Sequence, residues 1–305
     1  MTSGRHRTAP FLLDVDTGVD DALAIAYAVR AGVYLVGIST VAGNVPVDLA
    51  TENTRRVLAM VQAESIPVHR GASRPLVVSH NDAVHVHGDN GLGGAELNPS
   101  RAPESSMNAI EAILDAAARH AGELVIVALG PLTNLAIALN LRPNLVEQVG
   151  RLVIMGGAYA VPGNVTPHAE YNVYTDPHAA LQVFSAPWRE IFAIGLDVTH
   201  QTVLRRDRWR RIGDAGSGSA ELVRRITARS FLDRGLDAVY LHDPLAVAAA
   251  LNPSVVAVQR HRVDVEIQGE TRGKTTPSVG GTVQVATGVD REGFERQFVD
   301  CLGLP

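Results

Sequence analysis

Short apolar runs rich in β-forming residues alternate with segments of helical periodicity along much of the chain. Buried strands are predicted at residues 11–15, 34–41, 124–129, 152–155 and 191–196. The clearest predicted helices cover residues 20–30, 46–63, 106–120 and 131–141. Because alternating strands and helices pack as a parallel sheet with helices on both faces, we expect an α/β fold with an open, mainly parallel sheet.

The length and composition favour one large domain. The 305 residues are 46% hydrophobic and 19% charged, which is ample for a sizeable core. No Pro/Gly/Ser linker separates two different halves, so we expect a single domain over residues 1–305, with 1–10 as a disordered tail. Long polar stretches at 70–103 and 214–219, the second followed by a helical segment at 220–234, are candidate gating loops.

Charge and cysteine content exclude several classes of protein. A net charge of −5, with no Lys/Arg block and 5% aromatic residues, disfavours a nucleic-acid partner. No uncharged run reaches the roughly 18 residues of a membrane span, and Asp14 and Asp16 interrupt the first apolar stretch, so we expect no membrane partner and no signal peptide. Cys301 is the single cysteine, which suits a reducing compartment. We therefore expect a cytoplasmic protein with a small ligand.

An acidic cluster follows the first predicted strand. Asp14, Asp16, Asp20 and Asp21 lie within eight residues at a strand-to-helix turn, and ligands of open parallel sheets bind beyond the carboxyl ends of strands. Crowded carboxylates cost free energy unless a cation neutralises them, and oxygen ligands suit calcium or magnesium. The alternative is that Asp20 caps a helix and Asp14 is solvated.

Two later motifs carry further polar groups. Asp243 follows His242 at the start of a helical run over residues 245–251, where helix capping is the alternative role. The second motif runs from Met155 through two glycines and places three polar side chains after a strand: Asn164, Glu170 and Asn172. Glycines permit close backbone approach, and the amide and carboxyl groups suit a polyhydroxylated ligand. Alternatively, the two asparagines only stabilise turns.

Together these motifs resemble a known family. Residues 13–22, Leu-Asp-Val-Asp-Thr-Gly-Val-Asp-Asp-Ala, are similar to the signature of the inosine-uridine nucleoside hydrolases, and the later motifs agree in order and spacing to about Leu251. The resemblance implies the nucleoside hydrolase fold, with a Rossmann-like core, in a homodimer or homotetramer. It also implies calcium-dependent hydrolysis of ribonucleosides to ribose and free base by metal-activated water.

The resemblance further implies a role for individual residues. Calcium would be held by Asp16, Asp21, Asp243 and the backbone carbonyl of Leu129. Catalysis would use Asp16 as general base, Asn44 beside the water, and His242 facing the leaving base. Substrate would be bound by Asp20, Asn164, Glu170, Asn172, His87, Met155 and Phe231. A histidine whose pKa lies near neutrality is a plausible acid for the leaving group. Base preference stays open, because Phe231, Arg234 and Tyr240 stand where the family usually carries tyrosines.

Three other interpretations were weighed. A zinc site at His85 and His87 lacks a cysteine or third histidine nearby. A haloacid dehalogenase-type magnesium phosphatase would fit Asp14 and Asp16 as an Asp-x-Asp pair. However, the only lysine, Lys274, lies far along in a Gly/Thr-rich loop with no acidic pair close behind it. A non-catalytic ribose- or nucleoside-binding protein would have no need of a general base such as Asp16.

Overall fold

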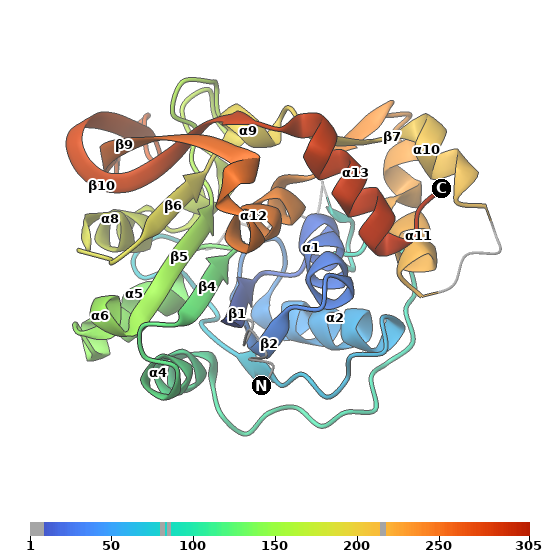
Figure 1. Cartoon of the computed structure of the whole chain (residues 1–305), viewed down its shortest axis with the longest axis horizontal. Coiled ribbons are helices and arrows are strands. Elements are labelled where there is room, and N and C mark those ends of the chain that lie inside the picture. The colour runs from blue at the N-terminus through green and yellow to red at the C-terminus, as the bar shows by residue number, and fades with distance from the viewer. Residues whose placement is uncertain (1–8, 80–82, 84–86, 214–217) are drawn as a thin grey trace, which may run out of the picture.

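The computed structural model describes residues 9–79, 83, 87–213 and 218–305, and the statements below refer to these residues. Its centre is an eight-stranded sheet in the order β3-β2-β1-β4-β5-β6-β10-β9 (Figure 1). The strands are β1 Pro10–Val15, β2 Tyr34–Thr40, β3 Val68–Arg70, β4 Leu124–Ala128, β5 Val149–Met155, β6 Ile191–Ile194, β9 Val256–Val265 and β10 Thr275–Val289. All neighbouring pairs are parallel except β9 with β10. The predicted open, mainly parallel sheet is confirmed.

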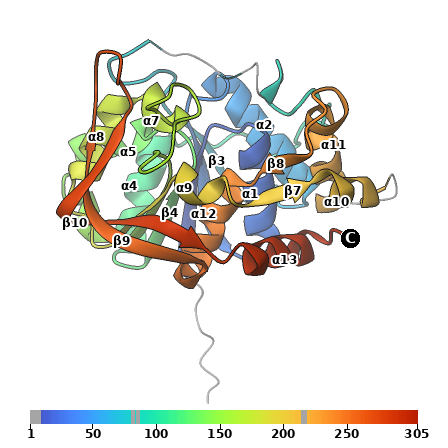
Figure 2. The ribbon, with the colours of Figure 1, turned by 90° about the horizontal axis from the view of Figure 1, so that it is seen from above.

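Helices cover both faces of this sheet. They are α1 Val19–Arg30, α2 Val47–Met60, α4 Ala109–Arg119, α5 Thr133–Leu141, α6 Leu145–Gln148, α7 Tyr171–Thr175, α8 Pro177–Ser185, α9 Leu196–Thr199, α10 Arg206–Arg211, α11 Ser219–Leu232, α12 His242–Leu251 and α13 Arg291–Leu302, with a short 3-10 helix at Pro253–Val255. A second, two-stranded sheet pairs β7 Val203–Arg205 with β8 Ala238–Tyr240. It lies near α10 and α11, at the end of the molecule away from β9 and β10 (Figure 2).

The alternation of side chains along β1 explains why the sheet is covered twice. Phe11, Leu13 and Val15 join a core with residues of α1, α2, α11, α12 and α13. Leu12 points to the other face and joins a core with residues of α4, α5, α6 and α8. Every residue of β1 is buried, as a central parallel strand requires.

The structure corrects two expectations about the ends of the chain. Pro10 was assigned to a disordered tail, but it starts β1 and pairs with Tyr34; residues 1–8 lie outside the described part. The Gly/Thr-rich segment beginning at Lys274 was expected to be a loop, but Thr275 starts the long strand β10. Its antiparallel partner β9, the preceding strand in the chain, lies at the edge of the sheet.

Most of the first proposed gating loop is described, but only residues 218 and 219 of the second are. In the first, residues 80–82 and 84–86 lie outside the described part, and in the second residues 214–217 do. Ser219 begins α11 rather than ending a loop. None of the helices in the described ranges combines the length and the apolar character needed to cross a membrane.

Candidate active site

A cavity of about 420 Å³ lies where the polar segments that follow β1, β2, β4 and β5 meet α12. Ten of the residues predicted for the site line it: Asp20, Asn44, His87, Leu129, Met155, Asn164, Glu170, Asn172, His242 and Asp243. These residues come from chain positions up to 223 apart, from Asp20 to Asp243. They meet because parallel strands end at one edge of the sheet.

The turn between β1 and α1 is organised by Asp21. Its carboxylate accepts hydrogen bonds from the backbone N–H groups of Asp16 (3.1 Å) and Gly18 (2.9 Å), which stabilises the start of α1. Asn44 Nδ2 donates a third at 3.2 Å. Burial, and then the charge of Asp20, raise the pKa of Asp21 to about 6, although the hydrogen bonds from the Gly18 and Asp16 N–H groups oppose the shift.

Asp16 is fully buried behind Asn44. Its carboxylate accepts hydrogen bonds from the Asn44 backbone N–H at 2.7 Å and from Asn44 Nδ2 at 3.2 Å. Gly43 permits this approach, because a Cβ atom there would lie 2.0 Å from Asp16 Oδ2. Burial, and then the charge of Asp21, raise the pKa of Asp16 well above its ordinary value. Asn44 therefore connects Asp16 to the cavity that it lines.

Three carboxylates converge closely enough to share one cation. Asp20, Asp21 and Asp243 each offer an oxygen within 4.8 Å of the other two. Asp20 Oδ1 is buried and accepts no hydrogen bond from any described residue. Burial raises the pKa of Asp243 well above its usual range, and the charges of Asp20, Asp21 and Asp16 raise it further. An unpartnered oxygen within mutually repelling carboxylates fits a hard divalent cation.

The grouping differs in part from the ligand set that the resemblance implies. Asp20, assigned to the sugar, belongs to the converging set, whereas Asp16 lies behind it, hydrogen-bonded to Asn44. The Leu129 carbonyl, assigned to the cation, accepts a hydrogen bond from Asn172 Nδ2 at 2.7 Å. The three acidic residues that converge are thus a group that could hold a cation.

The opposite wall is built around Glu170 and Asn172. Glu170 caps α7 and accepts hydrogen bonds from the backbone N–H groups of Asn172 (2.8 Å), Gly157 (3.0 Å) and Val173 (3.2 Å). Asn172 Nδ2 also donates to the carbonyl of Met155, at 3.1 Å, and so joins the ends of β4 and β5. Burial raises the pKa of Glu170 above its ordinary value, although the three hydrogen bonds lower it. Asn164 is exposed and fixes the start of α7 through the Tyr171 N–H.

A second cavity of about 770 Å³ adjoins the first. Asp20, His87 and His242 line both and form the wall that they share. His87 Nδ1 accepts the backbone N–H of Val19 at 3.1 Å. A backbone N–H only donates, so the neutral ring carries its proton on Nε2. Beyond the wall, apolar residues of β7, β8 and the start of α1 line the second cavity together with polar residues, among them Arg205, Arg234 and Arg291.

His242 begins α12 and is held by a hydrogen bond between its Nδ1 and Thr199 Oγ1 at 2.7 Å. Burial first, and then the neighbouring His200 and His87, lower the pKa of His242 to about 3. The unperturbed pKa near neutrality, from which an acid role was predicted, is therefore shifted down in this structure. The ring is neutral at physiological pH, because transfer out of water disfavours the charged form.

One predicted residue, Phe231, lies elsewhere. Phe231 lines neither cavity; its ring packs on Trp209, with centroids 5.1 Å apart, in the core beneath α11. This placement gives no support to its assignment to substrate. His85, weighed as a zinc ligand with His87, lies outside the described residues.

The cavities also contain residues that sequence reasoning missed. Tyr171 and Tyr174 line the first cavity, and Tyr171 Oη donates to the Gly43 carbonyl at 2.7 Å. His200 lines the second and, with Thr199, follows β6 directly. The rule that ligands bind beyond strand ends could have drawn attention to these last two, since the strand itself was predicted.

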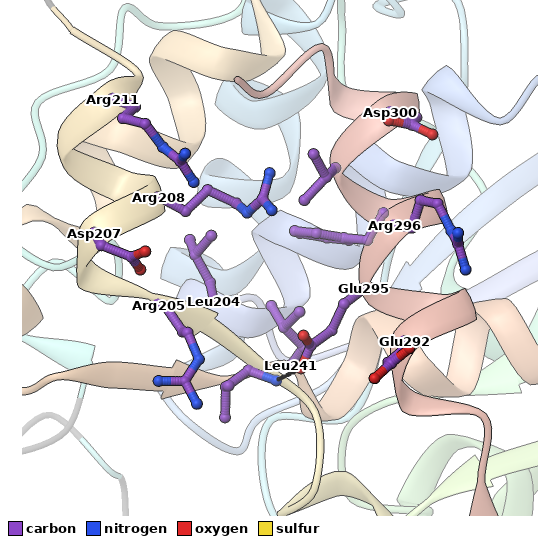
Figure 3. Close-up of a pocket in the computed structure, with 13 residues that line it drawn as sticks. Leu204, Arg205, Asp207, Arg208, Arg211, Leu241, Glu292, Glu295, Arg296 and Asp300 are labelled. Atoms are coloured by element: carbon purple, nitrogen blue, oxygen red, sulfur yellow. Dashed lines mark hydrogen bonds between the residues drawn. The ribbon is translucent and has the colours of Figure 1, made fainter.

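A third cavity, of about 410 Å³, lies between α10 and α13 (Figure 3). Arginines and carboxylates line it in equal number: Arg205, Arg208, Arg211, Arg296, Asp207, Glu292, Glu295 and Asp300. None of the predicted site residues lines it. Its balanced charge does not favour an ionic ligand of either sign.

The sequence of the chain matches a protein family. The model of the inosine-uridine preferring nucleoside hydrolases matches residues 11–296. The chain is 37% identical over 303 residues to the non-specific ribonucleoside hydrolase RihC of Escherichia coli, covering 97% of this chain and 98% of RihC. It is 36% identical over 275 residues to a probable uridine nucleosidase of Arabidopsis thaliana, covering 87% and 84%.

The fold matches solved structures as well. The purine-preferring ribonucleoside hydrolase from Gardnerella vaginalis superposes with a TM-score of 0.90 at 33% identity, over 96% of this chain and 98% of that one. An inosine-guanosine nucleoside hydrolase superposes with a TM-score of 0.86 at 28% identity, over 97% and 99%. The expected nucleoside hydrolase fold is thereby confirmed.

Proposed function

The chain belongs to the inosine-uridine preferring nucleoside hydrolase family, and we propose that it hydrolyses ribonucleosides to ribose and free base with a calcium ion and an Asp16 general base. The observation that carries the metal and base assignments is the meeting of Asp20, Asp21 and Asp243 beside Asn44, which is hydrogen-bonded to both Asp21 and Asp16. The family membership carries the reaction itself, cleavage of an N-glycosidic bond.

Calcium would be held by Asp21 and Asp243 with Asp20 or Asp16 and the Leu129 carbonyl, where its charge would offset the carboxylates and lower the pKa of a nearby water molecule. Asp16 accepts the proton of the attacking water. Its raised pKa makes the ionised carboxylate a stronger base than an exposed aspartate. Asn44 holds the carboxylate in place through two hydrogen bonds, so the base does not need to reorganise.

The sugar would occupy the first cavity. Its hydroxyl groups need several donors and acceptors fixed in space, which Glu170, Asn172 and Asn164 supply from one capped turn. The positive charge that develops on the ribose as the bond breaks lies among buried carboxylates, which stabilise it most strongly where water is excluded. The base would leave towards the second cavity, across the wall formed by His87 and His242.

The phosphatase interpretation fits the geometry poorly. Its nucleophile would be Asp14, whose carboxyl accepts hydrogen bonds from Ser39 Oγ (2.5 Å) and Asn134 Nδ2 (2.8 Å). Neither of these partners lines the candidate cavity, whereas Asn44, which is hydrogen-bonded to Asp16, does. Lys274, the expected phosphate-binding residue, does not line that cavity either and bridges to Ala169 in the backbone.

One assay tests the proposal. Purified protein is incubated with inosine, adenosine, uridine or cytidine, each with calcium and after chelation, and free base and ribose are quantified. We expect stoichiometric base and ribose from at least one nucleoside, and loss of both after chelation. Release of phosphate from a phosphoester, or saturable nucleoside binding without product, would overturn the proposal in favour of one of the two alternatives.

A further inference from the structure

The segment after β6 reaches the wall between the two cavities through Thr199. This residue ends α9, and its side chain is fully buried. Thr199 Oγ1 lies 2.7 Å from His242 Nδ1, which is hydrogen-bond distance, and either atom could be the donor. Which of them donates decides where the His242 ring carries its own proton.

The burial of Thr199 settles the direction of this hydrogen bond. Within the described ranges, the hydroxyl has no hydrogen-bond partner other than His242. If the ring donated from Nδ1, the hydroxyl proton would be buried without an acceptor, which folded proteins rarely tolerate. With the hydroxyl as donor, Nδ1 is the acceptor and both groups are satisfied. A neutral His242 ring then carries its proton on Nε2.

We propose that Thr199 is a positioning residue for the hydrolysis, holding His242 as its neutral Nε2–H tautomer so that the ring presents a hydrogen-bond donor to the departing base. The proposal rests on the proposed function. The electron pair of the broken C–N bond leaves with the base, and water supplies hydroxide to the sugar and a proton to the base. The Nε2–H group stabilises the charge that develops on the base and transfers no proton itself.

The surroundings of the ring restrict its orientation. His200 and Tyr240 pack on His242 with ring centroids 5.6 and 5.4 Å away, which restricts rotation of the imidazole. His87, on the same wall, is also an Nε2–H tautomer, because its Nδ1 accepts the Val19 N–H. The wall therefore places two neutral donors beside the second cavity, a match for the carbonyl oxygens and ring nitrogens of a nucleobase.

The tautomer is tested directly by nitrogen NMR of protein labelled with ¹⁵N-histidine, with His242 identified by its absence in His242→Ala. We expect an unprotonated Nδ1 and a protonated Nε2 in the wild type. Thr199→Val keeps the shape but removes the donor, and should shift His242 towards the Nδ1–H form; Thr199→Ser should restore the wild-type signals. A protonated Nδ1 in the wild type, or unchanged signals in Thr199→Val, would overturn the proposal.

Kinetics test the consequence for the reaction. Thr199→Val should lower kcat for the preferred nucleoside by about 3- to 10-fold, as expected for one hydrogen bond in the transition state, with little change in KM. Hydrolysis of 4-nitrophenyl riboside, whose leaving group needs little help, should be unaffected. Thr202→Val is the matched control, because Thr202 is equally buried and its hydroxyl donates to the Thr199 carbonyl rather than to His242. An equal loss in the control, or on both substrates, refutes positioning.

A double-mutant cycle shows whether Thr199 acts through His242. In the His242→Ala background, Thr199→Val should cause no further loss. Additive losses would contradict the mechanism. The NMR result does not depend on turnover. If the protein hydrolyses none of the nucleosides, the proposed function is refuted, but the tautomer of His242 still tests the role of Thr199.

Discussion

Calcium should raise the thermal stability of the protein at pH 7.5 much more than at pH 5. Asp21 is fully buried and Asp20 partly so, and burial raises the pKa of each from 3.8 to about 6. Without a cation, the folded state holds protons between about pH 4 and pH 6 that the unfolded chain releases. These groups therefore contribute stability below about pH 4, and that contribution is lost as the pH rises through about 6.

The expected change in Tm on calcium binding follows from the size of the pKa shifts of Asp20 and Asp21. About two pKa units correspond to about 3 kcal/mol for Asp21, and to about 6 kcal/mol at most if Asp20 adds independently. For a chain of this length, 1 kcal/mol changes Tm by roughly 2 °C, so a cation that neutralises the pair should raise Tm by about 6–12 °C at pH 7.5. At pH 5 protons already neutralise the carboxyls, and calcium should add little.

The assay is thermal unfolding at each pH, monitored by circular dichroism. The protein is first freed of metal by chelation and moved into buffer without chelator, and it is then measured with and without added calcium. Asp21→Asn should shrink the calcium-dependent gain at pH 7.5. The matched control is Asp237→Asn, because the Asp237 side chain is fully exposed and does not belong to the proposed calcium site. This variant should leave the calcium-dependent gain in Tm unchanged. An equal gain at both pH values, or none at pH 7.5, would refute the reasoning.

Three further outcomes are expected. Chelation should abolish hydrolysis at 25 °C while leaving far-UV circular dichroism largely intact, because the proposed ligands are positioned by the sheet; full activity in protein shown by elemental analysis to be metal-free would contradict this. Asp16→Asn should lower kcat by about 10²- to 10⁴-fold with a smaller change in KM, since the amide keeps the shape but accepts no proton; activity within a few-fold of the wild type would exclude Asp16 as the base. His242→Ala should lower kcat/KM for inosine by roughly 10-fold. The pH profile of kcat between pH 6 and 8 should not change, because burial lowers the pKa of His242 to about 3 and the ring is neutral throughout this range. Loss of an ionisation near pH 6.5 in the variant would show that the ring titrates.

The sequence determined the architecture and most of the site's membership. Strand periodicity is a local property, so the runs that became β1, β2, β4, β5 and β6 were predicted close to their observed bounds. Their order as parallel strands then placed the acidic and amide residues that follow them at one edge. Residues as distant as Asp20 and Asp243 were predicted to share one site because their motifs resemble those of the nucleoside hydrolases, and in the structure their carboxylates converge.

Only the tertiary structure decided how these side chains pair and how strongly each is buried. It grouped Asp20 with Asp21 and Asp243, placed Asp16 behind Asn44, and joined Leu129 to Asn172. It also showed that β9 pairs with β10, that Phe231 packs on Trp209 in the core, and that Thr199 is hydrogen-bonded to His242. The physical reason is that a pKa or a tautomer depends on desolvation and on the one neighbour within hydrogen-bond distance, and both are set by long-range packing that no local pattern encodes.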